Sequence, residues 1–289
     1  ALDDPYCIGF FSGNELPWSD PVTYAGNLLR EKKSPARSAL TDALKRKFGK
    51  IEQLNTVLDT AFDSWRELEE NPVKALPDLT PIEAECRNFY RTALEHYFRP
   101  IRDMIRRYAP GKLYLGVRFM HYPDITLGEV AADFCDVVSM NRYSYDESEM
   151  RIPGRDVPIL VTEFHFGALD RGMFHPGLRW GGDQQDVAWC YIEYMKALLR
   201  NPACVGGHWF QYASQPFTGR CGDGENAQIG AVDITDNPRP EFRAALREVG
   251  EHLYRWRAGA QHSGDGGPVI VLPPDAIPAE RTAAQELQA

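Results

Sequence analysis

The sequence predicts an α/β fold in which parallel strands alternate with helices. Short apolar runs rich in β-branched and aromatic residues recur along the chain, and such runs are typical of strands buried in a parallel sheet. Stretches with apolar residues at helical spacing separate these runs. Polar and aromatic side chains gather where the runs end, as they do at the catalytic face of a (β/α)8 barrel. We therefore expect strand–helix units joined by right-handed crossovers.

Five strands are expected, which is too few for a closed barrel. A closed barrel of this class needs eight strands, and the region between Trp18 and Tyr108 is too helical to hold three more. The open first and last strands would expose unpaired edges, which favour association with other chains. The predicted fold is therefore a partial barrel with a helical insertion after its first strand. The expected strands are Tyr6 to Phe11, Lys112 to Arg118, Asp136 to Arg142, Val157 to Thr162 and Val205 to Phe210.

The helical insertion is expected at residues 34–108. Ser34 and Pro35 form a capping signal at its start, because Ser caps a helix N-terminus and Pro suits the first helical position. Pro100 lies within the last helix of the insertion and should kink or split it. The expected helices of the whole chain are 36–48, 51–68, 80–108, 126–134, 183–199 and 239–256.

Composition excludes several classes of protein. The 289 residues are 43% hydrophobic and 25% charged, as in ordinary soluble domains. A net charge of −9 argues against nucleic acid and anionic membranes as partners, and favours a neutral or weakly charged substrate. Six cysteines without a CxxC pair argue against a zinc site or a disulfide framework. We expect a catalytic portion at 1–258 and a polar tail rich in Pro, Ala and Gly at 259–289, with no signal peptide in this chain.

Two carboxylates stand out because each follows an expected strand. In the segment VPILVTEFHFG, Glu163 follows the apolar run Val157 to Thr162, and a buried charge is costly unless it is paired or functional. Glu15 follows Asn14 in SGNELPW, after the first strand. Taken alone, Glu163 fits a salt-bridged strand end and the Asn–Glu pair fits a turn. Together they match a retaining glycosidase, in which one carboxyl protonates the leaving oxygen and the other attacks the sugar. This chemistry needs no metal or organic cofactor.

Four segments resemble a known family. EFHFGALDRGMFHPGLR (Glu163 to Arg179) resembles the seventh-strand signature of glycoside hydrolase family 50, the β-agarases of the (β/α)8 clan A. FFSGNELPW, SMNRYSY and GGHWFQYASQPFTGR resemble the fourth, sixth and eighth strands of that family. The resemblance covers most of Tyr6 to Trp256 and implies a C-terminal portion, roughly strands 4 to 8 of the barrel. The first three strands and an accessory domain have no counterpart here.

The resemblance also implies residue roles. Glu15 matches the general acid/base and Glu163 the nucleophile in hydrolysis of β-linked galactose units of an agarose-type polysaccharide, by a secreted or periplasmic enzyme. Asn14 would bind the sugar 2-hydroxyl, Tyr143 would orient Glu163, and Trp209 would stack on a sugar. Polar contacts to substrate are also expected from four other residues, although each of these also fits a packed or hydrogen-bonded structural residue. They are Arg118, His121, Asn141 and His165.

Two other interpretations stay open. A β-galactosidase of the same clan would hydrolyse small galactosides without cleaving the polymer. A catalytically incomplete partial barrel would bind carbohydrate without releasing product, or would need a partner chain for the missing N-terminal half. Self-association is the other way in which the open edges could be covered.

Overall fold

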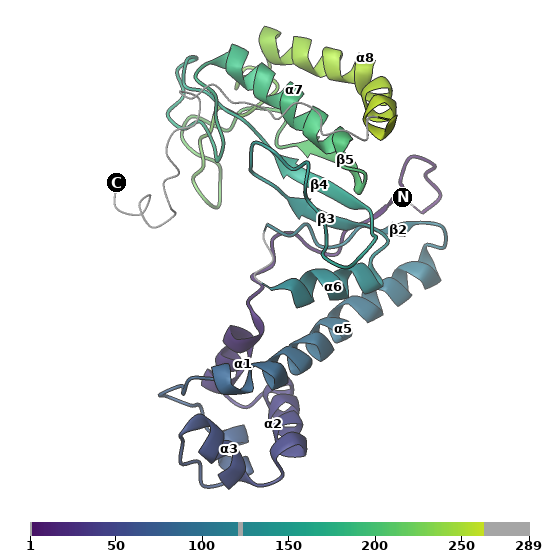
Figure 1. Ribbon diagram of the computed structural model, residues 1–289. Coiled ribbons are helices and arrows are strands. Elements are labelled where there is room, and N and C mark those ends of the chain that lie inside the picture. The colour runs from purple at the N-terminus through teal and green to yellow at the C-terminus, as the bar shows by residue number, and fades with distance from the viewer. Residues whose placement is uncertain (1, 121–123, 263–289) are drawn as a thin grey trace. The chain divides into compact units, whose positions relative to one another are not determined.

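The computed structural model describes residues 2–120 and 124–262 (Figure 1). The chain divides into two compact units, one formed by Ala1–Ser139 with Arg151–Pro158 and the other by Met140–Met150 with Ile159–Ala289. Five strands occur in the described residues. Each overlaps one of the expected runs, and none is longer than its run. The expected α/β class is confirmed by the alternation of these strands with helices and by their parallel pairing.

The first unit contains most of the helices and one pair of short strands. Strand β1 pairs in parallel with β2, with Gly9 opposite Leu113 and Phe10 opposite Tyr114. A close approach explains the glycine, because a Cβ on Gly9 would lie 2.4 Å from the Leu113 carbonyl oxygen. The elements are β1 (Gly9–Phe10), α1 (Pro21–Arg30), α2 (Pro35–Phe48), α3 (Ile51–Leu58), α4 (Trp65–Glu70), η1 (Thr80–Ile82), α5 (Glu83–Tyr108), β2 (Leu113–Tyr114) and α6 (Ile125–Phe134).

Local sequence signals account for the start and end of α2. The Ser34 side chain accepts a hydrogen bond from the Arg37 amide at 3.2 Å, and Pro35 occupies the first helical position. Gly49 ends the helix with a positive φ of 69°, a conformation that glycine adopts without a steric penalty. The helices of this unit bury a shared apolar core, which includes Leu29, Leu54 and Phe89.

The structure corrects the expected helix at 51–68. Helix α3 ends at Leu58, because Asp59 adopts the left-handed conformation with φ 51°, and α4 begins only at Trp65. The amide side chain of Asn55 holds the break, since it accepts a hydrogen bond from the Phe62 N–H and donates one to the Phe62 carbonyl. Pro100 does not split the third expected helix, and α5 continues through it.

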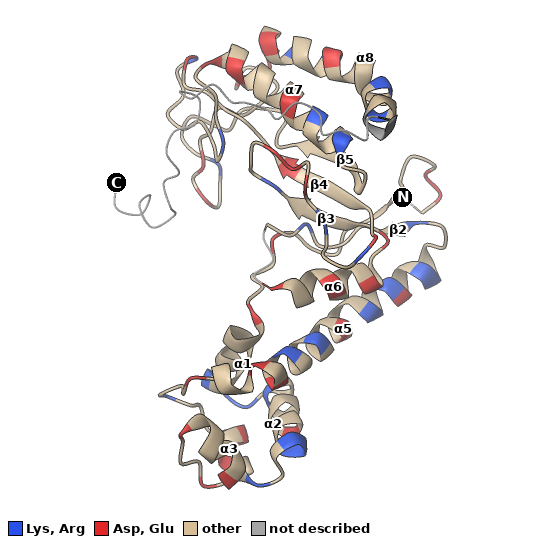
Figure 2. Ribbon diagram, in the orientation of Figure 1, with Lys and Arg blue, Asp and Glu red and all other residues tan. Residues whose placement is uncertain are grey.

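Charged side chains join α5 to α6 in this unit. Figure 2 shows Lys and Arg distributed along α5. Arg87 forms an ion pair with Asp124, whose side chain also caps α6, and Arg91 forms one with Glu129. The basic side chains of α5 are therefore partly neutralised within their own unit, which does not favour a binding surface for a polyanion.

The second unit is a parallel α/β layer. Its sheet has the order β3-β4-β5, with β3 (Val138–Asn141), β4 (Ile159–Phe164) and β5 (Cys204–Trp209), and the division between the units falls within β3. Every residue of β4 is buried, as expected for a central strand covered by helices. Helix α7 (Gln184–Arg200) packs on this sheet, and α8 (Pro240–His262) lies beside α7 (Figure 1). Phe164 stacks on Tyr194 of α7, with ring centroids 4.3 Å apart.

Several expectations concern the ends and the chemistry of the chain. Helix α8 runs past the expected end of its helix to His262, so the first residues of the predicted tail are helical, and residues 263–289 lie outside the described part. The six cysteines are free thiols. No helix in the described residues is long and apolar enough to cross a membrane. The described residues also hold no group of three or more His, Cys, Asp or Glu arranged to bind a metal ion.

Candidate active site

Glu163 lies near the end of β4 and is almost fully buried, with 6% of its surface exposed. The Tyr143 hydroxyl donates a 2.6 Å hydrogen bond to Oε2 of Glu163. The backbone brings the two residues together, because β3 and β4 are neighbours and the Arg142 amide donates to the Glu163 carbonyl oxygen at 2.8 Å. The carboxyl ends of parallel strands meet at one edge of a sheet, which is where catalytic groups of α/β proteins gather.

His165 is held by backbone groups on both ring nitrogens. Its Nε2 accepts a 2.8 Å hydrogen bond from the Leu178 amide, so this nitrogen carries no proton. Nδ1 therefore carries the proton and donates to the Phe210 carbonyl oxygen at 3.2 Å. Burial lowers the pKa of His165 to about 3, which keeps the ring neutral. The ring lies 4.7 Å from that of Tyr143, centroid to centroid, so it supports the residue that contacts Glu163.

Asn141 and Trp209 are also engaged by their own unit. Asn141 is buried in β3, and its Oδ1 accepts a 2.7 Å hydrogen bond from the Thr162 hydroxyl. The Trp209 indole N–H donates to the Ile229 carbonyl oxygen at 2.9 Å. Its ring packs edge-on against Phe164 and lies 4.3 Å from Phe242 of α8. The contacts of Trp209 connect the end of β5 to the sheet and to α8.

Arg220 is a residue near Glu163 that the sequence interpretation missed. Its guanidinium forms two-pronged hydrogen bonds with Asp223 and lies 5.6 Å from the centre of the Phe210 ring. The hydrogen bond to Asp223 raises the pKa of Arg220, and the negative charges of Glu225 and Glu163 contribute to the same shift. Arg220 thus places a cation in the electrostatic surroundings of the buried carboxylate. The one signal in the sequence is that Arg220 ends the run resembling the eighth strand.

The first unit holds the Asn14–Glu15 pair at the end of β1. Glu15 donates its backbone N–H to the Arg118 carbonyl oxygen at 3.2 Å. Both residues have positive φ, 49° for Glu15 and 51° for Arg118, although neither is glycine. Such conformations cost about 1–3 kcal/mol each and are concentrated at functional sites. The Arg118 amide is fixed by the Ser139 hydroxyl at 2.9 Å, and its guanidinium lies 5.7 Å from the centre of the Phe11 ring.

The expected site residues therefore fall into two groups, one in each unit. Asn14, Glu15 and Arg118 lie at the strand ends of the first unit, with Asn14 exposed and the other two half-buried. Glu163 and its hydrogen-bond partner Tyr143 lie in the second unit, as do Asn141, His165 and Trp209. His121 lies outside the described residues.

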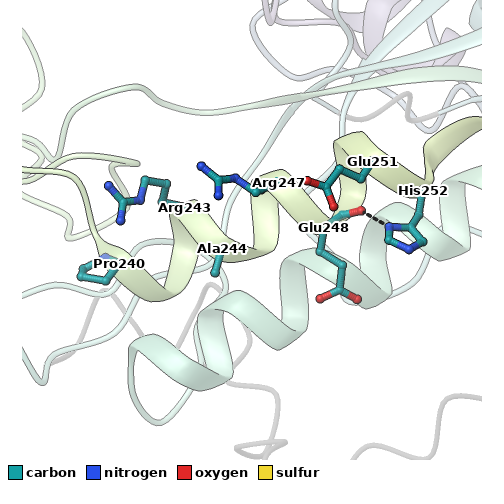
Figure 3. Close-up of a pocket in the computed structure, with 7 residues that line it drawn as sticks. All are labelled: Pro240, Arg243, Ala244, Arg247, Glu248, Glu251 and His252. Atoms are coloured by element: carbon teal, nitrogen blue, oxygen red, sulfur yellow. Dashed lines mark hydrogen bonds between the residues drawn. The ribbon is translucent and has the colours of Figure 1, made fainter.

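A hollow on α8 has a different character (Figure 3). It has a volume of about 260 Å³ and is lined by α8 residues alone, and Figure 3 shows Arg243, Arg247, Glu248 and Glu251 projecting from successive turns. These four side chains are exposed, and His252 is bonded to the Glu248 carbonyl oxygen at 2.9 Å. The arrangement is that of a solvated helix face, so this hollow offers no candidate site.

The fold and the site define an α/β protein with a buried carboxylate at the end of a parallel strand. No family model matches the chain. Beta-agarase B of Vibrio sp. (strain JT0107) is 36% identical in an alignment that is 274 positions long and covers 88% of this chain and 28% of that protein. A solved structure described as an exo-beta-agarase superposes with a TM-score of 0.79 and 35% identity over 88% of this chain and 36% of that chain. For the structure of PfGH50B the TM-score is 0.77, with 30% identity over 86% of this chain and 37% of that chain.

The chain is thus similar to β-agarases of glycoside hydrolase family 50 over most of its own length, which confirms the resemblance predicted from its sequence. It spans a little over a quarter of the curated relative, 28% of that protein.

Proposed function

We propose that this chain carries the catalytic carboxylates of a retaining glycoside hydrolase that cleaves β-galactosidic linkages in an agarose-type polysaccharide. The observation that carries the proposal is the hydrogen bond between Tyr143 and Glu163 at the end of β4. A buried carboxylate aimed by a hydroxyl at a strand end is suited to attack a sugar carbon. The similarity to β-agarases supports agarose as the polymer.

The reaction would proceed in two steps. Glu163 attacks the anomeric carbon and forms a glycosyl–enzyme ester, while Glu15 donates its proton to the departing glycosidic oxygen. Glu15 then takes a proton from a water molecule, whose oxygen attacks the same carbon and releases Glu163 as a carboxylate. Asn14 would bind the sugar 2-hydroxyl, a contact that strengthens in the transition state. Because one step needs an acid and the other a base, a bell-shaped pH profile is expected.

The fold around this site is proposed to be part of a (β/α)8 barrel. The parallel pairs β1–β2 and β4–β5 support this architecture, since both occur in barrels of this class. A separate chain that supplies the N-terminal barrel half, or a second copy of this chain, would complete the sheet. Light scattering of the purified chain tests whether a second chain is needed, because a monodisperse and fully active monomer would contradict that need.

The experiment that tests the function is release of neoagaro-oligosaccharides from agarose by the purified chain. We expect release by the parent and none by Glu163→Gln, which keeps the size of the side chain but removes its charge. Glu251→Gln makes the same chemical change on the exposed face of α8 (Figure 3) and should leave release unchanged. Continued release by Glu163→Gln would contradict the assignment. Hydrolysis of an aryl β-galactoside without polymer cleavage would instead favour a galactosidase acting on small substrates.

A further inference from the structure

A second hollow lies in the second unit, between the loop that follows β4 and the loop that precedes α8. Its volume is about 370 Å³, within the range of roughly 300–1,000 Å³ typical of small-molecule sites. None of the residues expected at the active site lines it. The lining combines one aromatic ring, Phe217, with polar groups on Ser214, Gln228, Asp233 and Arg239.

Arg239 and Gln228 offer hydrogen-bond donors that this unit does not use. Arg239 is buried, with 7% of its surface exposed, and has no carboxylate within ion-pair distance among the described residues. Its Nε donates to the Gly230 carbonyl oxygen and its Nη2 to the Ser214 hydroxyl, so Nη1 is left to donate to a ligand. Gln228 is 1% exposed, and its Oε1 accepts from the Met173 amide while its Nε2 has no acceptor in the described part of the chain. A buried donor without an acceptor indicates a bound water or ligand.

Asp233 supplies an acceptor in the same hollow. Its Oδ1 is used by the amides of Thr235 and Asn237 and by the Thr235 hydroxyl, all at 3.0 Å or less. These three hydrogen bonds all go to Oδ1, so a ligand in the hollow would be bound through Oδ2. The remaining cation of the lining, Arg171, is paired with Asp170 and Glu241. The hollow and the partners of Arg171 thus carry two positive and three negative charges, which disfavours an anion and suits a neutral ligand.

An exposed pair of aromatic rings adjoins these groups. Phe217 and Phe174 come from the two different loops, and their ring centroids lie 4.6 Å apart. Both are solvent-accessible, with 48% of Phe217 and 65% of Phe174 exposed. Apolar rings of this size are normally buried, so an exposed pair beside a polar hollow marks a binding surface. A flat ring beside both donors and acceptors suits a pyranose, which has an apolar face and hydroxyls that both donate and accept.

We propose that this hollow is a saccharide-binding pocket in which Phe217 stacks on a sugar ring while Arg239, Gln228 and Asp233 bind its hydroxyls. The choice of a neutral galactan as the ligand rests on the function proposed above. The pocket would hold one unit of the polysaccharide through residues that take no part in bond cleavage. Phe174 positions the Phe217 ring from the opposite loop.

The test measures binding of neoagarohexaose by calorimetry in the full chain carrying Glu163→Gln, so that the probe is not consumed. Phe217→Ala in this background should weaken binding about tenfold or more, whereas Phe217→Trp, which keeps a flat ring, should retain it. Tyr254→Ala, which removes an aromatic ring that is 85% exposed on α8, is the matched control and should bind as the background does. Circular dichroism verifies that each variant is folded, and Phe174→Ala gives an independent second variant.

Two results would contradict the proposed pocket. One is unchanged affinity in both Phe217→Ala and Phe174→Ala, and the other is no binding of the hexasaccharide by the Glu163→Gln chain. Hydrolysis of agarose by the parent is measured beside binding, which separates this inference from the proposed function. Product release together with affinity that does not depend on Phe217 would leave the function standing and remove the pocket. Affinity that depends on Phe217 without any product release would leave the pocket standing and remove the function.

Discussion

The Tyr143 hydroxyl and Oε2 of Glu163 are 2.6 Å apart, and this hydrogen bond links the second residue after β3 to the penultimate residue of the buried strand β4. The Tyr143 ring in turn lies against His165, whose nitrogens are both bonded to backbone groups. The carboxylate is thus aimed by a phenol that is itself fixed by a neutral imidazole. The orientation of the Glu163 carboxylate therefore depends on Tyr143, on His165 and on the backbone groups that hold His165.

Tyr143→Phe should reduce kcat roughly 10- to 100-fold, because a hydrogen bond to a charged group contributes about 1.5–3 kcal/mol. The ring would still pack on His165, so the melting temperature should change little. The measurement is kcat on agarose together with thermal unfolding. Tyr145→Phe is the control, since the Tyr145 hydroxyl bonds the Trp180 carbonyl oxygen at 2.9 Å and not a site carboxylate. Equal losses of activity in the two variants would count against a positioning role for Tyr143.

The protein should lose stability in acid because His165 is buried in its neutral form. Burial lowers its pKa to about 3, from an unfolded value of 6.5. The folded state therefore binds fewer protons than the unfolded state between these values, so the stability present above pH 6.5 is lost as the pH falls. The loss from this residue reaches about 1.4 kcal/mol per pH unit. In urea unfolding of the parent, His165 should lower the free energy of unfolding by about 2 kcal/mol between pH 6.5 and pH 5.

His165→Gln is the variant that isolates this effect, because its amide can accept and donate without titrating. We expect it to be less stable than the parent at pH 7 but to lose less stability on acidification. His96→Gln, at an exposed position on α5, should retain the parent's pH dependence. The interpretation is wrong if the parent and His165→Gln show the same slope of unfolding free energy against pH.

Arg37 should be a major source of stability in the first unit. Its side chain is fully buried, and its guanidinium donates to the carbonyl oxygens of Glu31, Leu68 and Asn71. Arg37→Leu would leave these carbonyls without donors, and we expect a loss of about 3 kcal/mol or more in unfolding free energy. Arg46→Leu, on the exposed surface of the same helix, should cost about 0.5 kcal/mol or less. Chemical denaturation of both variants measures the difference.

Strand positions could be predicted because they depend on local patterns. The run from Ile159 to Phe164 is apolar and rich in β-branched residues, and every residue of it is buried. Glu163 stood out for the same reason, as a charge within such a run. The break after Leu58 could not be predicted from periodicity, because the apolar stripe continues through Ala61 and Phe62. It depends on the Asn55 side chain, which bonds the backbone of Phe62 and competes with the helix.

The surroundings of Glu163 were only partly accessible from the sequence. Tyr143 comes two residues after the end of β3, so its proximity to the end of the neighbouring strand β4 follows from parallel pairing. Arg220 and the backbone partners of His165 come from long loops, whose conformations depend on tertiary contacts. The sequence left two roles open for His165, a polar contact to substrate and a hydrogen-bonded structural residue, and its two nitrogens are bonded to Leu178 and Phe210. No periodicity reports such loop contacts, which is why the structure was needed to find them.

A substitution at Gly177 would disturb the position of His165 without replacing any polar side chain. It has φ 87°, and a Cβ at this position would lie 2.5 Å from Nε2 of His165. Gly177→Ala would therefore displace the imidazole and weaken its bond to Leu178, in addition to the strain of the left-handed backbone. We expect a loss of about 2–4 kcal/mol in stability and a lower kcat, because the Tyr143 ring packs on the displaced His165.

Gly172→Ala separates the steric clash from the backbone strain. Gly172 has nearly the same φ, 88°, in the same loop, but a Cβ there would meet nothing within 4 Å. Its cost should be the strain alone, about 1 kcal/mol. Urea denaturation and kcat are measured for both variants, and only Gly177→Ala should lower kcat. If Gly172→Ala lowered kcat as much, the effect would come from the loop as a whole, and the contact between Gly177 and His165 would carry no special role in holding Glu163.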